Sequence, residues 1–153
     1  MIRRATESDA GALTRLINAA FEVEKFFIES DRISLPQVRE YFHTGAFLVA
    51  EDGGEMAACV YVEFRGERGY FGLLSVDPIR QRAGLGRRLI AEAEEFCRDA
   101  GCRFMDLRIV NLREELPAYY TKLGYSETGT SPFPPDAETK LPCHFIDMSK
   151  ALA

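Results

Sequence analysis

Two glycines between a strand-like segment and a helix-like segment are the residues of this chain best suited to holding a ligand. Gly84 and Gly86 follow the apolar segment 72–76 and stand at the start of an amphipathic run from Leu85. A helix leaves its first N–H groups unpaired and carries partial positive charge there, so a phosphate binds without a dedicated side chain. Glycine lets the phosphate approach the main chain closely. The segment therefore predicts a diphosphate-binding loop.

Spacing separates this loop from two other phosphate-binding motifs. A P-loop has Lys-Ser or Lys-Thr after its second glycine, and this sequence has neither. A dinucleotide-binding fingerprint needs a third small residue three positions after Gly86, where Leu89 stands. The pattern that remains is Gln81-x-x-Gly84-x-Gly86. Positive charge beside it comes from Arg82, Arg87 and Arg88.

A second segment combines two aromatic residues with a glycine. It runs from Tyr119-Tyr120 to Leu123-Gly124-Tyr125 and follows a strand-like run over 103–110. A phenol of pKa about 10 is protonated at neutral pH, so it can act as a general acid. Adjacent tyrosines on a helix also commonly pack against a sheet, and both interpretations stay open from the residues alone.

The glycine loop resembles the acetyl-CoA-binding signature of the GNAT superfamily of N-acetyltransferases, and segment 119–125 is similar to a second signature of that family. Both occur in the family's order, with Asn111 between them. The resemblance implies direct transfer of an acetyl group from acetyl-CoA to an amine. It also implies that Tyr120 is the general acid, and we assign Tyr119 to the core.

The resemblance further implies where acetyl-CoA binds. The strands ending at Val76 and Val110 are expected to run parallel and then separate, so that the pantetheine arm completes the sheet between them by strand-like pairing. The N–H groups from 82 to 87 would take the pyrophosphate. The expected cofactor-binding residues are Leu74, Ser75, Val76, Gln81, Arg82, Ala83, Gly84, Leu85, Gly86, Arg87 and Asn111.

The general base and the acceptor are less well marked. Segment 70–76 has no carboxylate, so Glu63 is the nearest candidate base, with an exposed strand-end glutamate beside Arg65 as the alternative. Glu22 and Glu24 are alternatives that would line the acceptor pocket. The long segment 128–140 suggests a lid over a small-molecule acceptor. A protein N-acetyltransferase and a non-catalytic acyl-CoA-binding module are the competing functions.

Composition excludes several other classes. Of 153 residues, 19 are Lys or Arg and 24 are Asp or Glu, which gives a net charge of −5 without blocks of like charge and argues against a nucleic-acid or anionic-membrane binder. No apolar run is long enough to span a membrane and no signal-peptide core is present, so we expect a cytoplasmic protein. Acetyl-CoA and an amine are the expected partners, and a homodimer is one of the assemblies left open.

Four cysteines without metal-binding spacing predict reduced core thiols and no metal.

Hydrophobic periodicity places these motifs on a single domain covering residues 1–153. The element order β-α-α-β-β-β-α-β-α-β-β predicts an α/β sandwich with a mixed, mostly antiparallel sheet. This order matches the GNAT-type fold, with helices on both faces of the sheet, that the resemblance implies. Asp52-Gly53-Gly54 predicts a hairpin. The expected strands are 2–5, 46–50, 56–64, 70–76, 103–110, 124–128 and 144–148, and the expected helices are 6–26, 36–42, 85–100 and one within 116–125.

Overall fold

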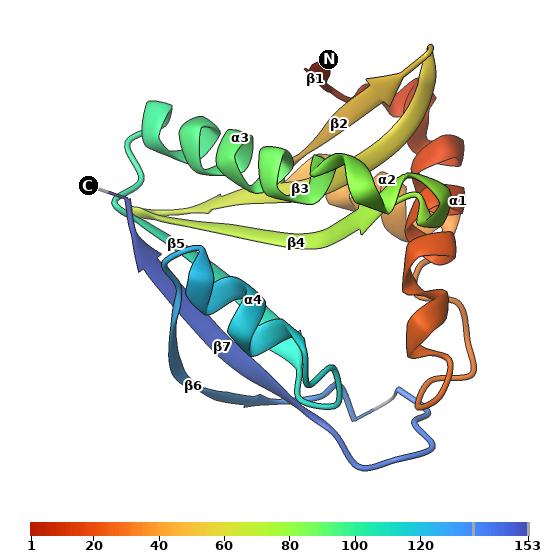
Figure 1. Ribbon diagram of the computed structural model, residues 1–153, viewed down its shortest axis with the longest axis vertical. Coiled ribbons are helices and arrows are strands. Elements are labelled where there is room, and N and C mark those ends of the chain that lie inside the picture. Colours follow the sequence, from red (N-terminus) through yellow and green to blue (C-terminus); the bar gives the residue numbers. More distant parts are fainter. Residues whose placement is uncertain (136, 153) are drawn as a thin grey trace.

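The computed structural model describes residues 1–135 and 137–152, with the side chains of residues 81–83 outside the description. Within this part of the chain, seven strands form one sheet in the order β1-β2-β3-β4-β5-β7-β6 (Figure 1). The strands are β1 (Ile2–Arg4), β2 (Ala46–Asp52), β3 (Glu55–Arg65), β4 (Arg68–Val76), β5 (Phe104–Val110), β6 (Ser126–Pro132) and β7 (His144–Ala151). The helices are α1 (Ala10–Ala20), α2 (Leu35–Thr44), α3 (Leu85–Asp99) and α4 (Leu116–Lys122), with 3-10 turns η1 (Glu7–Asp9), η2 (Phe21–Glu24) and η3 (Pro78–Ala83). The predicted fold class and element order are confirmed.

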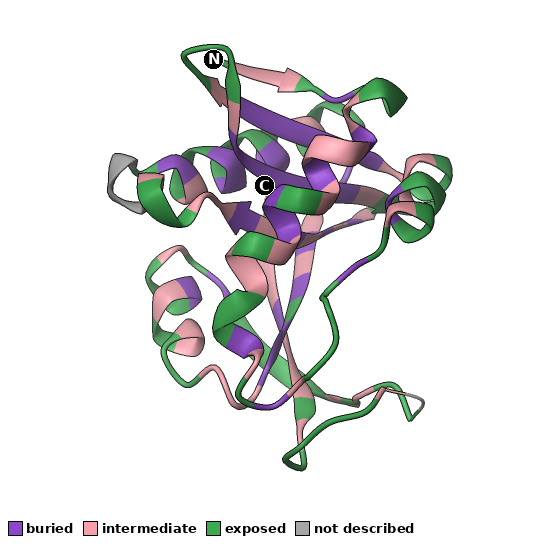
Figure 2. Ribbon diagram, turned by 90° about the vertical axis from the view of Figure 1, so that its right-hand side faces the viewer, coloured by how far each residue is buried: buried purple, intermediate pink, exposed green. Residues whose placement is uncertain are grey.

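Two hydrophobic cores lie on opposite faces of the sheet. Helices α1 and α2 supply Leu13, Ile17 and Val38 to one core, on what we term the α1/α2 face. Helices α3 and α4 supply Leu89 and Tyr120 to the other, on the α3/α4 face. Figure 2 shows the buried residues concentrated in the strands between the helices, whereas β6 is mostly exposed. Each helix is therefore held through one apolar side, as its sequence periodicity requires.

Strands β4 and β5 are parallel neighbours over a short stretch. Both strands are fully described, and they pair at Arg68–Phe104, Gly69–Met105 and Tyr70–Asp106. Beyond Tyr70, β4 continues along β3 while β5 continues along β7, so the two strands separate (Figure 1). One edge of β4 and one edge of β5 consequently face a gap in the sheet, as the family resemblance implied.

A β-bulge interrupts β4 at the start of this gap. The pairing with β3 shifts between Tyr61–Gly72 and Cys59–Ser75, which leaves one extra residue in β4. Leu73 lies in this bulge with a φ of 53°, the one positive φ of a non-glycine residue in the described chain. Such a conformation costs free energy and is found mostly at functional sites. The bulge therefore sets how the main chain of β4 runs along the edge of the gap.

Several predicted boundaries needed correction. The first helix was expected to reach about residue 26, but α1 ends at Ala20 and η2 follows. Asn18 binds the returning chain through both the N–H and the carbonyl of Ile33, so the chain turns back instead of extending the helix. Strand β6 runs to Pro132, beyond the expected residue 128, because its last residues pair with β7. The hairpin prediction is confirmed, with Gly53 and Gly54 both at positive φ in a two-residue turn.

The cysteines agree with the prediction in oxidation state and partly in location. All four are free thiols, and Cys59, Cys97 and Cys102 are buried. Cys143 is half-buried and precedes β7, so its assignment to the core was wrong. None of the helices in the described residues is both long and apolar enough to cross a membrane.

Candidate active site

The glycine loop forms the start of α3. Gly84 has a φ of 68°, in the left-handed region that favours glycine, and ends η3 immediately before the helix. The first hydrogen bond of α3 runs from the Arg88 N–H to the Gly84 carbonyl at 3.2 Å. The preceding N–H groups, of Leu85, Gly86 and Arg87, belong to the first turn of α3, where an α-helix supplies no acceptor of its own. They are the donors that a helix of this length offers to an anion.

Space around the two glycines differs. A Cβ at Gly84 would have no heavy atom within 4 Å, so the main chain there is open. A Cβ at Gly86 would lie 3.6 Å from Cγ2 of Val76 and 3.7 Å from the hydroxyl oxygen of Tyr119. Gly86 therefore faces the gap side of β4 and the helix that carries the tyrosines. The backbone of residues 81–83 belongs to η3, but the predicted side-chain roles of Gln81, Arg82 and Ala83 fall outside the described residues.

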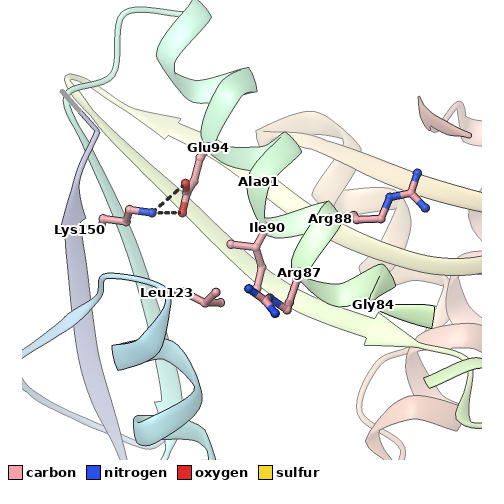
Figure 3. A pocket seen from close by; sticks show the side chains of 8 residues that line it. All are labelled: Gly84, Arg87, Arg88, Ile90, Ala91, Glu94, Leu123 and Lys150. Atoms are coloured by element: carbon pink, nitrogen blue, oxygen red, sulfur yellow. Dashed lines mark hydrogen bonds and ion pairs between the residues drawn. The ribbon is translucent and has the colours of Figure 1, made fainter. Parts of the chain in front are cut away.

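A groove of about 530 Å³ begins at this loop and runs between α3 and the end of α4 (Figure 3). Arg87 and Arg88 lie at its start, beside Gly84. At its far end Lys150 donates to both carboxylate oxygens of Glu94, at 3.0 and 3.1 Å. Its volume lies within the range of small-molecule sites. The complete lining is Gly84, Arg87, Arg88, Ile90, Ala91, Glu94, Leu123 and Lys150.

The predicted arm-binding residues lie on the two edges of the gap. The side chains of Leu74 and Val76 pack on the α3/α4 core, which leaves their main-chain groups to the strand edges. Ser75 is buried, and its hydroxyl donates to the Leu73 carbonyl at 2.9 Å. Asn111 follows β5, where its side-chain oxygen accepts from the His144 N–H at 2.8 Å. The gap is thus bordered by strand backbone on one side and by a fixed asparagine on the other.

The two tyrosines of α4 have different surroundings. Tyr120 is 6% exposed and packs against the rings of Phe71 and Tyr125. Burial and the neighbouring Tyr119 raise its pKa well above the ordinary value, although the charge of Arg113 opposes the shift. Its hydroxyl has no hydrogen-bond partner among the described residues. Tyr119 is half-buried against the same core, as assigned, but its hydroxyl extends toward Gly86.

Glu63, the candidate base, has both carboxylate oxygens engaged by neighbouring side chains. Its two carboxylate oxygens accept hydrogen bonds from the Tyr61 hydroxyl at 2.7 Å and from Nε of Arg65 at 2.8 Å. Burial works to raise its pKa, but the bonds from Arg65 and Tyr61 outweigh this effect and hold the pKa below the ordinary value. The structure therefore matches the alternative, a strand-end glutamate paired with Arg65. No contact joins Glu63 to Tyr120 among the described residues.

A buried carboxylate lies instead at the open end of the gap. Glu24 is 8% exposed and accepts from Arg113 Nη1 at 3.1 Å. Burial raises the pKa of Glu24, and the nearby guanidinium of Arg113 opposes the shift. Arg113 also pairs with the exposed Glu115. Sequence analysis named Glu24 as a pocket residue but missed Arg113, because 89 residues separate the two and no local pattern marks their contact.

The connection between β6 and β7 reaches across to the α1–α2 connection. Ile28 and Thr139 form a β-bridge, and the Lys140 N–H donates to the Phe27 carbonyl at 2.7 Å. The two connections meet at the lower right of Figure 1. Phe133 does not contact this bridge but stacks on Phe145 of β7, with centroids 4.9 Å apart. This strap, the described part of residues 133–143, is thus tied to the α1–α2 connection.

Comparison with known proteins agrees with this geometry. The profile of the acetyltransferase (GNAT) family matches residues 12–125. The thialysine N-epsilon-acetyltransferase of Bos taurus is 28% identical over an alignment of 145 positions, and the alignment covers 81% of this chain and 82% of that protein. The solved ribosomal-protein-alanine N-acetyltransferase of Brucella melitensis has a TM-score of 0.79 at 22% identity and covers 99% of both chains. An N-acetyltransferase from Staphylococcus aureus Mu50 has a TM-score of 0.79 at 17% identity and covers 100% of this chain and 98% of that chain.

Proposed function

Because the chain belongs to the GNAT acetyltransferase family, we propose that it transfers the acetyl group of acetyl-CoA to the amine of a small molecule and that Tyr120 protonates the leaving thiolate. The observation that carries the proposal is the gap between β4 and β5, beside which α3 begins with the first-turn N–H groups of the glycine loop and Tyr120 lies in the α3/α4 core. A thioester bound through its diphosphate would extend along this gap.

The residues present fit acetyl-CoA. The N–H groups of Leu85, Gly86 and Arg87 would hold the pyrophosphate, since the open main chain at Gly84 lets an anion approach. The guanidinium of Arg87 adds positive charge at the start of the groove. Main-chain groups of Leu74 and Val76 would pair with the amides of the pantetheine arm, in the way a strand pairs with a sheet edge. Asn111 would contact the arm from the β5 side.

Tyr120 supplies the proton that the reaction needs at sulfur. Its raised pKa keeps the phenol protonated at neutral pH, and its hydroxyl oxygen has no competing partner among the described residues. The attacking amine forms a bond to the acyl carbon while the bond from that carbon to sulfur breaks, and the nitrogen releases a proton to water. The hydroxyl of Tyr120 then gives its proton to the thiolate and recovers one from water. Glu63, held by Tyr61 and Arg65, is not part of this proposal as a base.

The strap supports a small acceptor. A protein N-acetyltransferase must admit an extended segment of its substrate, whereas here residues 139 and 140 bond to residues 27 and 28 and join two connections that an extended substrate would have to pass. The relative from Bos taurus carries the name of a small-molecule acetyltransferase, which agrees with this preference.

A product screen tests the proposal. The protein is incubated with acetyl-CoA and thialysine, lysine, spermidine or a peptide with an N-terminal alanine, and the products are identified by mass spectrometry. We expect an acetylated small amine. Acetylation of the peptide alone would favour the protein N-acetyltransferase. Binding of acetyl-CoA with no acetylated product from any amine would favour the non-catalytic module.

A further inference from the structure

Tyr70 lies where β4 leaves β5, on the face opposite to Tyr120. It forms the last parallel pair with Asp106, and its ring packs partly buried against the α1/α2 core. Tyr120 belongs to the α3/α4 core. A thioester in the gap would therefore have Tyr120 on one side and Tyr70 on the other.

The glycine that follows two positions later sets the direction of the Tyr70 ring. An ideal Cβ on Gly72 would lie 2.9 Å from the Tyr70 hydroxyl oxygen and 3.2 Å from its Cε2 atom. The ring therefore occupies the space that a side chain at position 72 would take, and it extends along the strand into the part that β5 no longer pairs. A glycine within a strand weakens the strand and often marks a place where another group lies close to the backbone. Here the group close to the backbone of Gly72 is the Tyr70 ring.

A chain of contacts holds the ring in this position. The guanidinium carbon of Arg65 lies 4.1 Å from the Tyr70 ring centroid. Nε of Arg65 donates to Glu63, and Glu63 in turn accepts from the Tyr61 hydroxyl. Glu63 thus holds the guanidinium of Arg65 that lies over the Tyr70 ring. The phenol is oriented by its neighbours while its hydroxyl has no partner among the described residues.

Other polar groups at this point of the sheet are already engaged. The carboxylate of Asp106 accepts from Nε and Nη2 of Arg68, both at 2.7 Å. The Ser75 hydroxyl is buried on the Leu73 carbonyl. The remaining side chains of β4 beyond Tyr70 carry no hydrogen-bonding atom. On this face of the gap, within the described residues, the Tyr70 hydroxyl is the β4 side-chain group left to meet an acceptor.

We infer that the Tyr70 hydroxyl binds the acceptor amine, directly or through one water, and orients its lone pair toward the acyl carbon. The inference rests on the proposed acetyl transfer. The Tyr70 oxygen accepts a hydrogen bond from an N–H of the amine. As the nitrogen–carbon bond forms and the carbon–sulfur bond breaks, the nitrogen releases a proton to water and the thiolate takes one from Tyr120. Tyr120 then regains a proton from water, so the protons balance.

Tyr70→Phe tests this role, because it keeps the ring over Gly72 and removes the hydroxyl. With the best small amine of the screen, we expect kcat/KM for the amine to fall about tenfold or more, since a lost hydrogen bond in the transition state has this size. The acetyl-CoA dissociation constant and the melting temperature should stay at the wild-type values. Tyr41→Phe, which alters another tyrosine packed on the α1/α2 core, is the matched control and should keep wild-type kinetics.

Gly72→Ala provides the second arm. Its Cβ displaces the end of a side chain and not the backbone, so the protein should fold while the Tyr70 hydroxyl moves. Activity should fall as in Tyr70→Phe, and the double variant should lose little more than either single one. Wild-type kcat/KM for the amine in a folded Tyr70→Phe variant would overturn the inference and leave acetyl transfer intact. Failure of the wild type to acetylate any amine would overturn both.

Discussion

Glu24 and Arg113 form an ion pair, with 3.1 Å between Oε2 and Nη1, that joins the α1–α2 connection to the β5–α4 connection. Together with the bridge between Ile28 and Thr139, this pair links the two halves of the sheet where β4 and β5 have separated. Where the two strands have separated, the chain is therefore held together by contacts between connecting segments and not by pairing within the sheet.

Removing the cation should destabilise the protein in a pH-dependent way. Arg113→Gln leaves Glu24 buried without its counter-charge, which typically costs about 3–5 kcal/mol, and we expect the lower end because the Arg113 side chain is 20% exposed. The folded-state pKa of Glu24 is already raised, so its contribution to stability falls as pH rises through that pKa. The loss in free energy of unfolding caused by Arg113→Gln should therefore be larger at pH 8 than at pH 5. Urea denaturation at both values measures it.

A matched double variant separates charge from packing. Glu24→Gln combined with Arg113→Gln removes both charges, and it should recover part of the stability lost in Arg113→Gln alone. Equal deficits at pH 5 and pH 8, with no recovery in the double variant, would show that the pair stabilises through packing only.

Tyr120→Phe should lower kcat while leaving acetyl-CoA affinity close to wild type. The ring keeps its contacts with Phe71 and Tyr125, and only the proton donor is lost. General-acid catalysis is worth about 10²–10⁴-fold, so a decrease of at least about tenfold is expected even where water substitutes. Steady-state kinetics at saturating amine and acetyl-CoA measure the change.

Tyr119→Phe is the control for this variant. Its hydroxyl lies beside Gly86, so the substitution should alter acetyl-CoA affinity slightly and leave kcat unchanged. Equal kcat values in the two variants, with chemistry as the slow step, would show that Tyr120 is a packing residue.

The pH dependence of kcat should show no decrease from deprotonation of Tyr120 below about pH 10. Burial raises the pKa of Tyr120 above the ordinary tyrosine value of 10.0, and the protonated phenol is the active form. Activity that depends on Tyr120 should therefore be lost only as pH rises through this higher pKa. The ratio of wild-type kcat to that of Tyr120→Phe, measured from pH 7 to pH 10, should stay constant. A ratio that declines with a midpoint near pH 8 would contradict the assignment.

The two glycines of the loop should respond differently to alanine. A Cβ at Gly86 makes only ordinary contacts, so Gly86→Ala should fold normally and weaken acetyl-CoA binding by about tenfold through crowding of the pyrophosphate. Gly84→Ala forces an L residue to a φ of 68° and should cost about 1–2 kcal/mol of stability. Calorimetry for binding and thermal unfolding for stability separate the effects. Native acetyl-CoA affinity in folded Gly86→Ala would place the phosphate elsewhere.

Parts of the candidate site whose geometry is local were accessible from the sequence. The spacing of Gly84 and Gly86 encodes a turn into a helix, and the alternation of apolar residues encodes the strands on either side. The position of Tyr120 follows from the segment that ends at Gly124. These features depend on neighbours a few residues away, so the pattern alone predicts them.

Features that depend on tertiary contact were not accessible. The bond between Glu24 and Arg113, and the hydrogen bonds that occupy Glu63, require knowledge of which segments meet. The end of α1 at Ala20 depends on Asn18 binding the backbone of Ile33. Tyr70 carries no motif, and its role emerges only from the empty side-chain position at Gly72 beside it.

The bulge at Leu73 changes the phase of strand β4. Before it, the odd-numbered Gly69 and Phe71 face α3 and α4; after it, the even-numbered Leu74 and Val76 do. If Leu73 were kept but paired as an ordinary strand residue, the strand would turn Leu74 and Val76 toward α1 and bring the Ser75 hydroxyl into the opposite core. The bulge thus adds Leu73 to the α1/α2 core while Phe71, Leu74 and Val76 stay on the α3/α4 face. Removing Leu73 would shorten the strand by one residue and restore regular pairing with β3, while Leu74 and Val76 kept the α3/α4 face.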